Sequence, residues 1–202
     1  MTAQVIHLEP HRGTGPKSAE IGPNSVLQTL EALRALEGEA VAAAVRTEAG
    51  LPAEIPQRMI PEHWFVQLVD ALRHALPRAR AEAVLNQSGI RTADYVIENR
   101  IPAFARSVLR VLPATVARSL LLRAIRKHAW TFAGRGRMRL LPNAIELSDC
   151  PTCRDRRSSL SGGYYASAFE RLLTLADSRV RVREVECVSL GHGACVFTLT
   201  RE

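Results

Sequence analysis

The sequence is poor in aromatic residues and contains no long uninterrupted apolar segment. Aromatics make up only 5% of the 202 residues, so the core must come mainly from the Leu, Val, Ile and Ala within the 47% hydrophobic fraction. Arginines interrupt the longest apolar stretches, and none approaches the roughly 18 residues that a membrane span requires. Residues 1–19 also lack the apolar run of a signal peptide. We therefore expect a cytoplasmic protein without a membrane span.

The chain has few lysines but many arginines. Its net charge is +7, from 27 Lys and Arg against 20 Asp and Glu, and nearly all of the basic residues are Arg. This excess favours carboxylates, phosphates or the acidic face of another protein as partners. The sequence shows no helix-turn-helix signature, and its arginines look dispersed among glutamates rather than clustered with aromatics. We therefore expect no nucleic-acid partner.

The first two-thirds of the chain is predicted to be mainly helical. Residues 1–20 are polar and predict a disordered tail, whereas 21–130 show helical periodicity between breaks rich in Gly and Pro. Ser88-Gly89 is expected to break one helix, and Thr92 to cap the next. A helix over 114–129 is expected to bury a stripe that includes Val116 and Leu120. Helices are expected at 24–38, from Pro61 to Pro77, and over 78–87, 92–100, 103–111 and 114–129.

The pattern changes after Trp130. Short apolar runs separated by glycines and a Pro142-Asn143 turn predict an antiparallel sheet, and Gly162-Gly163 precede one helix that runs to about Ala176. We therefore predict an α+β fold with one domain over residues 21–202. Its helical part, 21–130, packs on a small twisted antiparallel sheet formed by 131–202.

All four cysteines lie in this last part of the chain. Cys150 and Cys153 form a C-x2-C turn, and the glycines between Cys187 and Cys195 allow a tight hairpin. Four thiolates can hold a zinc ion in a tetrahedron, and thiols stay reduced in the cytoplasm. The alternative is that the four are ordinary buried apolar cysteines. Glu184 and His192 are further donors nearby.

The same segment carries a family resemblance. The run Arg183 to Cys187 with Leu190-Gly191 and Cys195, together with the stretch from Cys153 to Phe169, resembles the closing motif of 4-vinyl-reductase domains. The resemblance implies a zinc site of Cys153, Glu184, Cys187 and Cys195, to which this sequence adds Cys150. We predict that the ligands are the four cysteines, with Glu184 as the alternative to Cys150 in the fourth position. It also implies a fold similar to small vesicle-tethering TRAPP subunits, with a buried apolar pocket. Over residues 20–202 the chain resembles the J-protein family of bacteriochlorophyll biosynthesis, long labelled 4-vinyl reductases.

The chemistry implied by that label needs a hydride source, and none is visible. Gly134-Arg135-Gly136 is too short for a dinucleotide-binding loop and lacks its third glycine. A closed zinc site is structural because it leaves no position for water. We therefore favour a carrier that binds a porphyrin or magnesium porphyrin and assists pathway enzymes. The resemblance makes magnesium chelatase or the methyltransferase that follows it the candidate partners. A divinyl tetrapyrrole reductase is the alternative, and a homodimer is left open.

A porphyrin site needs an apolar wall and cationic groups for the propionates. Each aromatic candidate also fits an ordinary helix core, and the basic run also fits a solvated helix face. Trp130 is the first choice among the wall residues because it lies at the junction between helix and strand. The wall candidates are Trp64, Phe65, Tyr95, Phe104 and Trp130. The rim candidates are Arg118, Arg123, Arg126 and Lys127.

Overall fold

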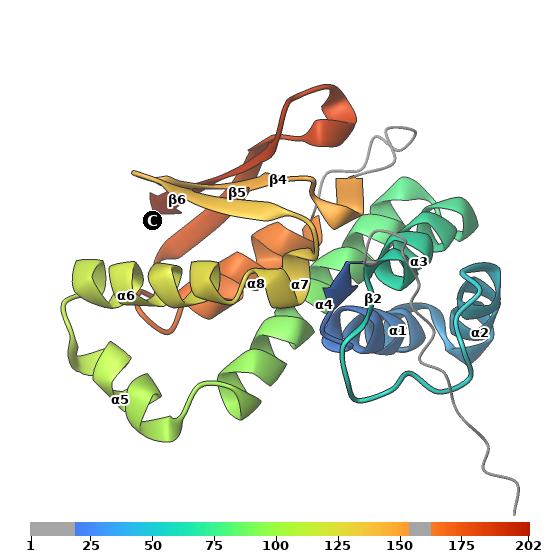
Figure 1. Cartoon of the computed structure of the whole chain (residues 1–202), viewed down its shortest axis with the longest axis horizontal. Coiled ribbons are helices and arrows are strands. Elements are labelled where there is room, and N and C mark those ends of the chain that lie inside the picture. Colours follow the sequence, from blue (N-terminus) through green and yellow to red (C-terminus); the bar gives the residue numbers. More distant parts are fainter. Residues whose placement is uncertain (1–18, 154–162) are drawn as a thin grey trace, which may run out of the picture.

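The computed structural model describes residues 19–153 and 163–202 (Figure 1). Of the tail predicted over residues 1–20, positions 1–18 lie outside the described residues, and the prediction is wrong at Glu20, which pairs with Pro61 in a short sheet. The α-helices are α1 (Asn24–Glu37), α2 (Glu39–Glu48), α3 (Glu62–Ala75), α4 (Arg78–Asn99), α5 (Ala103–Val111), α6 (Ala114–Lys127), α7 (Trp130–Ala133) and α8 (Gly163–Leu173). The strands are β1 (Glu20–Ile21), β2 (Ile60–Pro61), β3 (Arg137–Leu141), β4 (Ala144–Ser148), β5 (Val180–Glu186) and β6 (Cys195–Arg201), and the 3-10 turns are η1 (Pro151–Cys153) and η2 (Val188–Leu190). The predicted α+β class is confirmed.

Helix α4 is the centre of the helical part, with α1 packed against it on one side and α8 on the other. The expected break at Ser88-Gly89 is wrong, since one helix runs through both residues. A Cβ on Gly89 would lie 2.2 Å from the carbonyl oxygen of Tyr164. The glycine therefore permits close approach of α8, and the buried Ser88 hydroxyl bonds that of Thr29 on α1 at 2.7 Å.

The main sheet is antiparallel with strand order β3-β4-β6-β5. Helix α8 packs against β5 and helix α6 against β3, so both helices cover the same side of the sheet (Figure 1). The Pro142-Asn143 turn joins β3 and β4 as predicted, in a register that pairs Leu141 with Ala144. The second sheet pairs only β1 with β2.

Aromatic side chains fill the core between the sheet and the helices. Tyr164 and Tyr165 at the start of α8 are both 1% exposed, and their hydroxyls reach Ser25 at 3.3 Å and the carbonyl of Phe132 at 2.9 Å. The rings that contact one another there are Phe65, Phe132, Tyr164, Tyr165, Phe169 and Phe197. Six of the ten aromatic residues are thus committed to packing.

Helices α5 and α6 form a hairpin at the side of the molecule (Figure 1). The buried positions of α6 are Ala117, Leu121 and Ile125. The prediction that Val116 and Leu120 are buried is wrong, because each is 45% exposed. The buried stripe of α6 begins at Ala117, one residue after the predicted stripe begins at Val116. The side chains of Val116 and Leu120 therefore face outward.

The Gly134-Arg135-Gly136 segment contacts the buried carboxylate of Glu62. Gly134 has φ 56°, and Glu62 at the start of α3 is 3% exposed. The amide of Arg135 donates to Glu62 Oε1 at 3.1 Å. This loop therefore ties α3 to the start of the sheet.

Among the described residues, no helix is both long and apolar enough to span a membrane.

Candidate metal centre

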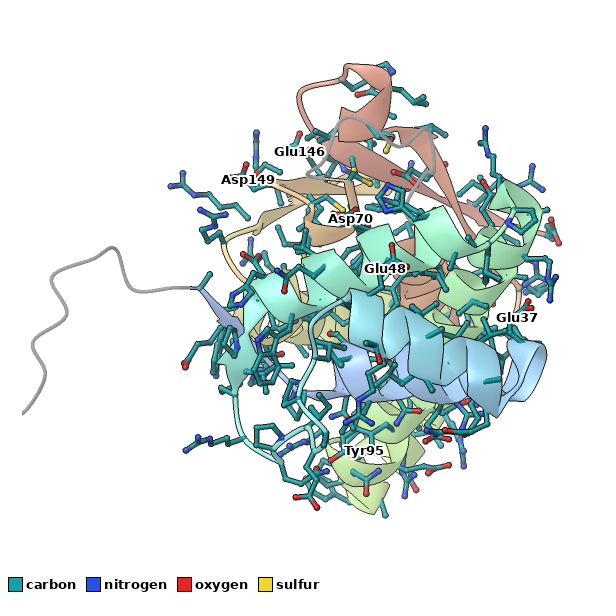
Figure 2. The ribbon with its side chains drawn as sticks, turned by 90° about the vertical axis from the view of Figure 1, so that its right-hand side faces the viewer. Glu37, Glu48, Asp70, Tyr95, Glu146 and Asp149 are labelled. Carbon is teal, nitrogen blue, oxygen red and sulfur yellow. The ribbon has the colours of Figure 1, made fainter. Side chains whose placement is uncertain are left out.

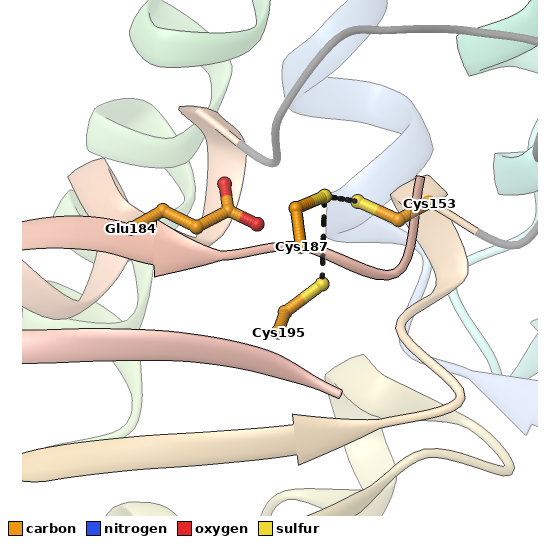
Figure 3. A group of neighbouring side chains, drawn as sticks. All are labelled: Cys153, Glu184, Cys187 and Cys195. Atoms are coloured by element: carbon orange, nitrogen blue, oxygen red, sulfur yellow. Dashed lines mark hydrogen bonds between the residues drawn. The ribbon is translucent and has the colours of Figure 1, made fainter. Parts of the chain in front are cut away.

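Three cysteines and one glutamate converge at one end of the sheet. The side-chain donor atoms of Cys153, Glu184, Cys187 and Cys195 all lie within 4.8 Å of one another. Cys153 Sγ is 3.3 Å from Cys187 Sγ, which is 3.8 Å from Cys195 Sγ (Figure 3). Sulfurs placed about 2.3 Å from one zinc ion in a tetrahedron are roughly 3.8 Å apart. The spacing of the cluster therefore suits such an ion.

Each donor is placed by local backbone structure. Val180 and Val182 of β5 face the core, and Glu184 follows them with the same parity. A register irregularity between Glu184 and Glu186 changes the alternation, as bulges do, so Cys187 can face the same point three residues later. Figure 3 shows the Glu184 carboxylate directed toward Cys187.

The chain makes a tight turn directly after Cys187. The carbonyl oxygen of Cys187 accepts from the amides of Leu190 at 3.0 Å and His192 at 3.2 Å. Gly191 takes φ 94°, a left-handed conformation that disfavours any side chain. Cys195 then opens β6 beside Leu147 of β4, which leads the chain into η1 and Cys153.

Cys150 lies close to the four donors but outside their group. It is fully buried, and its Sγ is 3.3 Å from the Thr152 hydroxyl. Burial raises the pKa of the Cys150 thiol well above its usual value. His192, the other spare donor, is exposed, with Nδ1 4.0 Å from Glu186 Oε2. The geometry therefore gathers the donor set that the family resemblance implies.

The thiols are electrostatically coupled. Hydrogen bonds from Cys150, Cys187 and Cys195 lower the pKa of Cys153. Hydrogen bonding to Cys153 in turn raises the pKa of Cys187 to about 11. A metal ion entering this cluster must displace protons, because a cysteine coordinates the ion as a thiolate and not as a thiol.

Arg73 brings a buried positive charge from α3 to the cluster. Its side chain is 6% exposed, and Nη2 donates to the Thr152 carbonyl oxygen at 2.6 Å. Burial lowers the pKa of Arg73, and the negative charge of Cys153 opposes that shift. Three thiolates and a carboxylate around a divalent cation leave two negative charges, and Arg73 offsets one of them. Sequence reasoning missed this residue, since nothing in the helical pattern of α3 distinguishes it.

The predicted porphyrin contacts are spread over several helices. Phe65 is fully buried in the aromatic core, whereas Trp64 on α3 and Tyr95 on α4 are half-buried. Phe104 on α5 and Trp130 on α7 are 73% and 57% exposed. Figure 2 places Tyr95 at the end of the molecule opposite Glu146 of β4 and Asp149, which follows that strand. Trp64, Tyr95, Phe104 and Trp130 are the four aromatics outside the core cluster.

The basic rim candidates lie on α6. Arg123, Arg126 and Lys127 are exposed, and Arg118 is half-exposed. A cavity of about 320 Å³ lies elsewhere, between α1 and α2, with Leu30, Ala42 and Leu51 in its wall. None of the predicted wall or rim residues lines that cavity.

No protein-family model matches the chain. The bacteriochlorophyll synthase 23 kDa chain of Rhodobacter capsulatus is 41% identical over 184 residues, which cover 89% of this chain and 86% of that protein. The chain belongs to the bacteriochlorophyll synthase 23 kDa chain family. The family member of Cereibacter sphaeroides is 36% identical over 201 residues, covering 92% of this chain and 93% of that protein. These names support the bacteriochlorophyll part of the predicted resemblance but not the 4-vinyl-reductase label.

Solved structures show which fold this 23 kDa chain family shares. An H-NOX protein from S. oneidensis in the Fe(II)NO state superposes with a TM-score of 0.51 at 15% identity, covering 90% of this chain and 99% of that one. The Fe(II) state of a triple mutant gives 0.52 at 14% identity, covering 90% and 96%. A structure concerned with haem redox potential and porphyrin distortion gives 0.51 at 13% identity, covering 90% and 95%. These neighbours give the predicted likeness to TRAPP subunits no support.

Proposed function

We propose that this chain binds a porphyrin or magnesium-porphyrin intermediate of bacteriochlorophyll biosynthesis and carries it between pathway enzymes. The observation that carries the proposal is the shared fold: this chain superposes on H-NOX proteins and on a structure concerned with haem redox potential and porphyrin distortion. Its relatives are named for bacteriochlorophyll synthase, which makes a porphyrin of that pathway the expected ligand. Magnesium chelatase and the methyltransferase that follows it remain the proposed enzyme partners. The reductase alternative has no observation of the described residues in its favour.

The metal centre has a structural role in this proposal. Zinc held by Cys153, Glu184, Cys187 and Cys195 would join η1 to the ends of β5 and β6. The ion would supply fixed geometry rather than reactivity, because four protein donors leave no open position. Arg73 then balances the charge and links the centre to α3 through the Thr152 carbonyl.

Glu184 is the expected fourth donor, and its replacement tests the assignment. We expect Glu184→Gln to weaken zinc binding by about tenfold or more, since an amide oxygen binds zinc less strongly than a carboxylate. Competition with a chromogenic chelator measures this change. Glu186→Gln is the matched control, because Glu186 is exposed, lies outside the group of four donors and has its carboxylate 4.0 Å from His192. Equal zinc affinity in both variants would remove Glu184 from the ligand set.

Trp130 is the proposed contact for the porphyrin ring. It is 57% exposed directly after α6, where Arg126 and Lys127 end the helix and can meet propionate groups. We expect Trp130→Ala to weaken binding by about fivefold to tenfold with zinc content unchanged. A fluorescence titration with a magnesium porphyrin measures this.

The control for Trp130 is the other tryptophan. Trp64→Ala alters a half-buried side chain on α3, and its affinity indicates whether Trp130 acts alone or with Trp64. Affinity that is unchanged in Trp130→Ala would contradict the placement. Turnover of a divinyl substrate by the purified chain with reduced nicotinamide would instead support the reductase.

A further inference from the structure

The positive charge of the chain is concentrated in one continuous segment. Residues 99–145 contain nine arginines and one lysine but no aspartate or glutamate. The rest of the chain carries 17 Lys and Arg against 20 Asp and Glu, so it is slightly acidic. The expectation that arginines are dispersed among glutamates therefore fails in this segment, which holds α5, α6, α7 and β3.

The same segment exposes apolar side chains on the α5–α6 hairpin. Phe104, Val108 and Val111 are spaced by four and three residues, so they share one face of α5. They are 73%, 47% and 82% exposed. Val116 and Leu120, each 45% exposed, continue the apolar surface on α6. Leu109 is the only residue of α5 that is buried. We call these five exposed side chains the hairpin surface.

Several arginines of this segment have no carboxylate partner in the part of the chain that the structure describes. Elsewhere exposed arginines pair locally, as Arg78 does with Glu82 at 3.0 Å and Arg171 with Asp94 at 2.7 Å. Within residues 19–153 and 163–202, no aspartate or glutamate forms an ion pair with Arg100, Arg110, Arg118 or Arg123. A segment that combines exposed apolar side chains with basic side chains free of carboxylate partners is typical of helices that lie in a lipid interface.

We propose that the α5–α6 hairpin docks on a membrane surface containing anionic lipids. Its apolar side chains would enter the headgroup region while the arginines bind lipid phosphates. The connection between the helices, Leu112-Pro113, adds no charged group at the tip. The hairpin lies on the side of the molecule away from α2 and α3, whereas Glu48 lies on the face that Figure 2 presents (Figures 1 and 2). Charge complementarity therefore orients the chain with the hairpin toward the lipid.

This inference does not depend on porphyrin binding, and it is tested without a porphyrin. The full chain is mixed with vesicles of phosphatidylglycerol and phosphatidylcholine or of phosphatidylcholine alone, then sedimented. We expect it to pellet only with the anionic vesicles. We expect Val108→Ser/Val111→Ser to weaken binding at least fivefold, through lost apolar insertion. Arg100→Gln/Arg110→Gln should weaken it by roughly tenfold or more, because each basic group near an anionic surface contributes about fivefold.

The matched controls replace apolar and arginine side chains that lie outside the α5–α6 hairpin. Leu36→Ser alters a 50% exposed apolar side chain next to Glu37 on α1, and Arg78→Gln/Arg171→Gln removes the same charge from paired arginines. Both should bind as the unaltered chain does, and thermal melting should show every variant folded.

Three results would overturn the proposal. One is a chain that stays in solution with anionic vesicles. Another is a valine variant that binds them as well as Leu36→Ser does, because the contact would then be purely ionic. The third is a change from dimer to monomer in Val108→Ser/Val111→Ser with vesicle binding intact, because a second copy of the chain would then cover the surface.

Discussion

A Cys187→Ser variant is expected to lose bound zinc and to melt at a temperature lower by roughly 10 °C or more. Cys187 Sγ is the sulfur that lies within 3.3 and 3.8 Å of the other two, so its loss leaves no compact donor set. Structural zinc sites contribute on the order of 10 kcal/mol to folding in small domains. Even a fraction of that is large for a chain of this length, where about 1 kcal/mol shifts the melting temperature by roughly 2–4 °C.

The measurements are zinc content by mass spectrometry and thermal unfolding followed by circular dichroism. Cys150→Ser is the matched control, because Cys150 is equally buried but lies outside the group of four donors. It should retain one zinc per chain. If Cys150→Ser lost the metal and Glu184→Gln kept it, four thiolates would form the site. Full zinc content in Cys187→Ser would refute the centre altogether.

Among substitutions that add a single methyl group to the helical part, Gly89→Ala is expected to lower the free energy of unfolding most. The added Cβ would lie 2.2 Å from the Tyr164 carbonyl oxygen and 3.1 Å from the Ala168 amide nitrogen. Both are backbone atoms of α8 that no rotamer change can move, so α4 and α8 must separate. Overpacking of this kind costs about 1–3 kcal/mol, and the upper end is expected here.

Chemical denaturation measures that loss as a lower free energy of unfolding. Gly193→Ala is the control, since nothing lies within 4 Å of the Cβ it would add. Its free energy of unfolding should stay within about 0.5 kcal/mol of the original. A Gly89→Ala chain as stable as the control would show that α4 and α8 are not in close contact at this position.

Gly89 also shows where reading the sequence fails. A serine followed by glycine is a common helix break, and the chain alone gives no sign that Tyr164, 75 positions later, needs the space. The outward orientation of Val116 and Leu120 is a similar case. Helical spacing indicates a stripe, but a chain with several apolar stripes on α6 does not show which one meets the sheet.

The metal centre was more accessible to sequence reasoning. Spacing of the cysteines indicated that Cys187 and Cys195 meet across a glycine-containing turn, and the structure brings them together with Cys153. Spacing could not choose between Cys150 and Glu184. That choice depends on the irregularity in β5, which directs a carboxylate toward the sulfurs and has no signature in the residues that form it.

The strand order β3-β4-β6-β5 has a consequence for how the chain is made. Strand β6 follows the other described strands in the sequence but occupies an inner position, and it is the strand that joins β4 to β5. A nascent chain that has not yet released β6 from the ribosome holds two unprotected strand edges, the kind that associate with other chains. Until β6 is inserted, the chain is therefore exposed to association through these two edges.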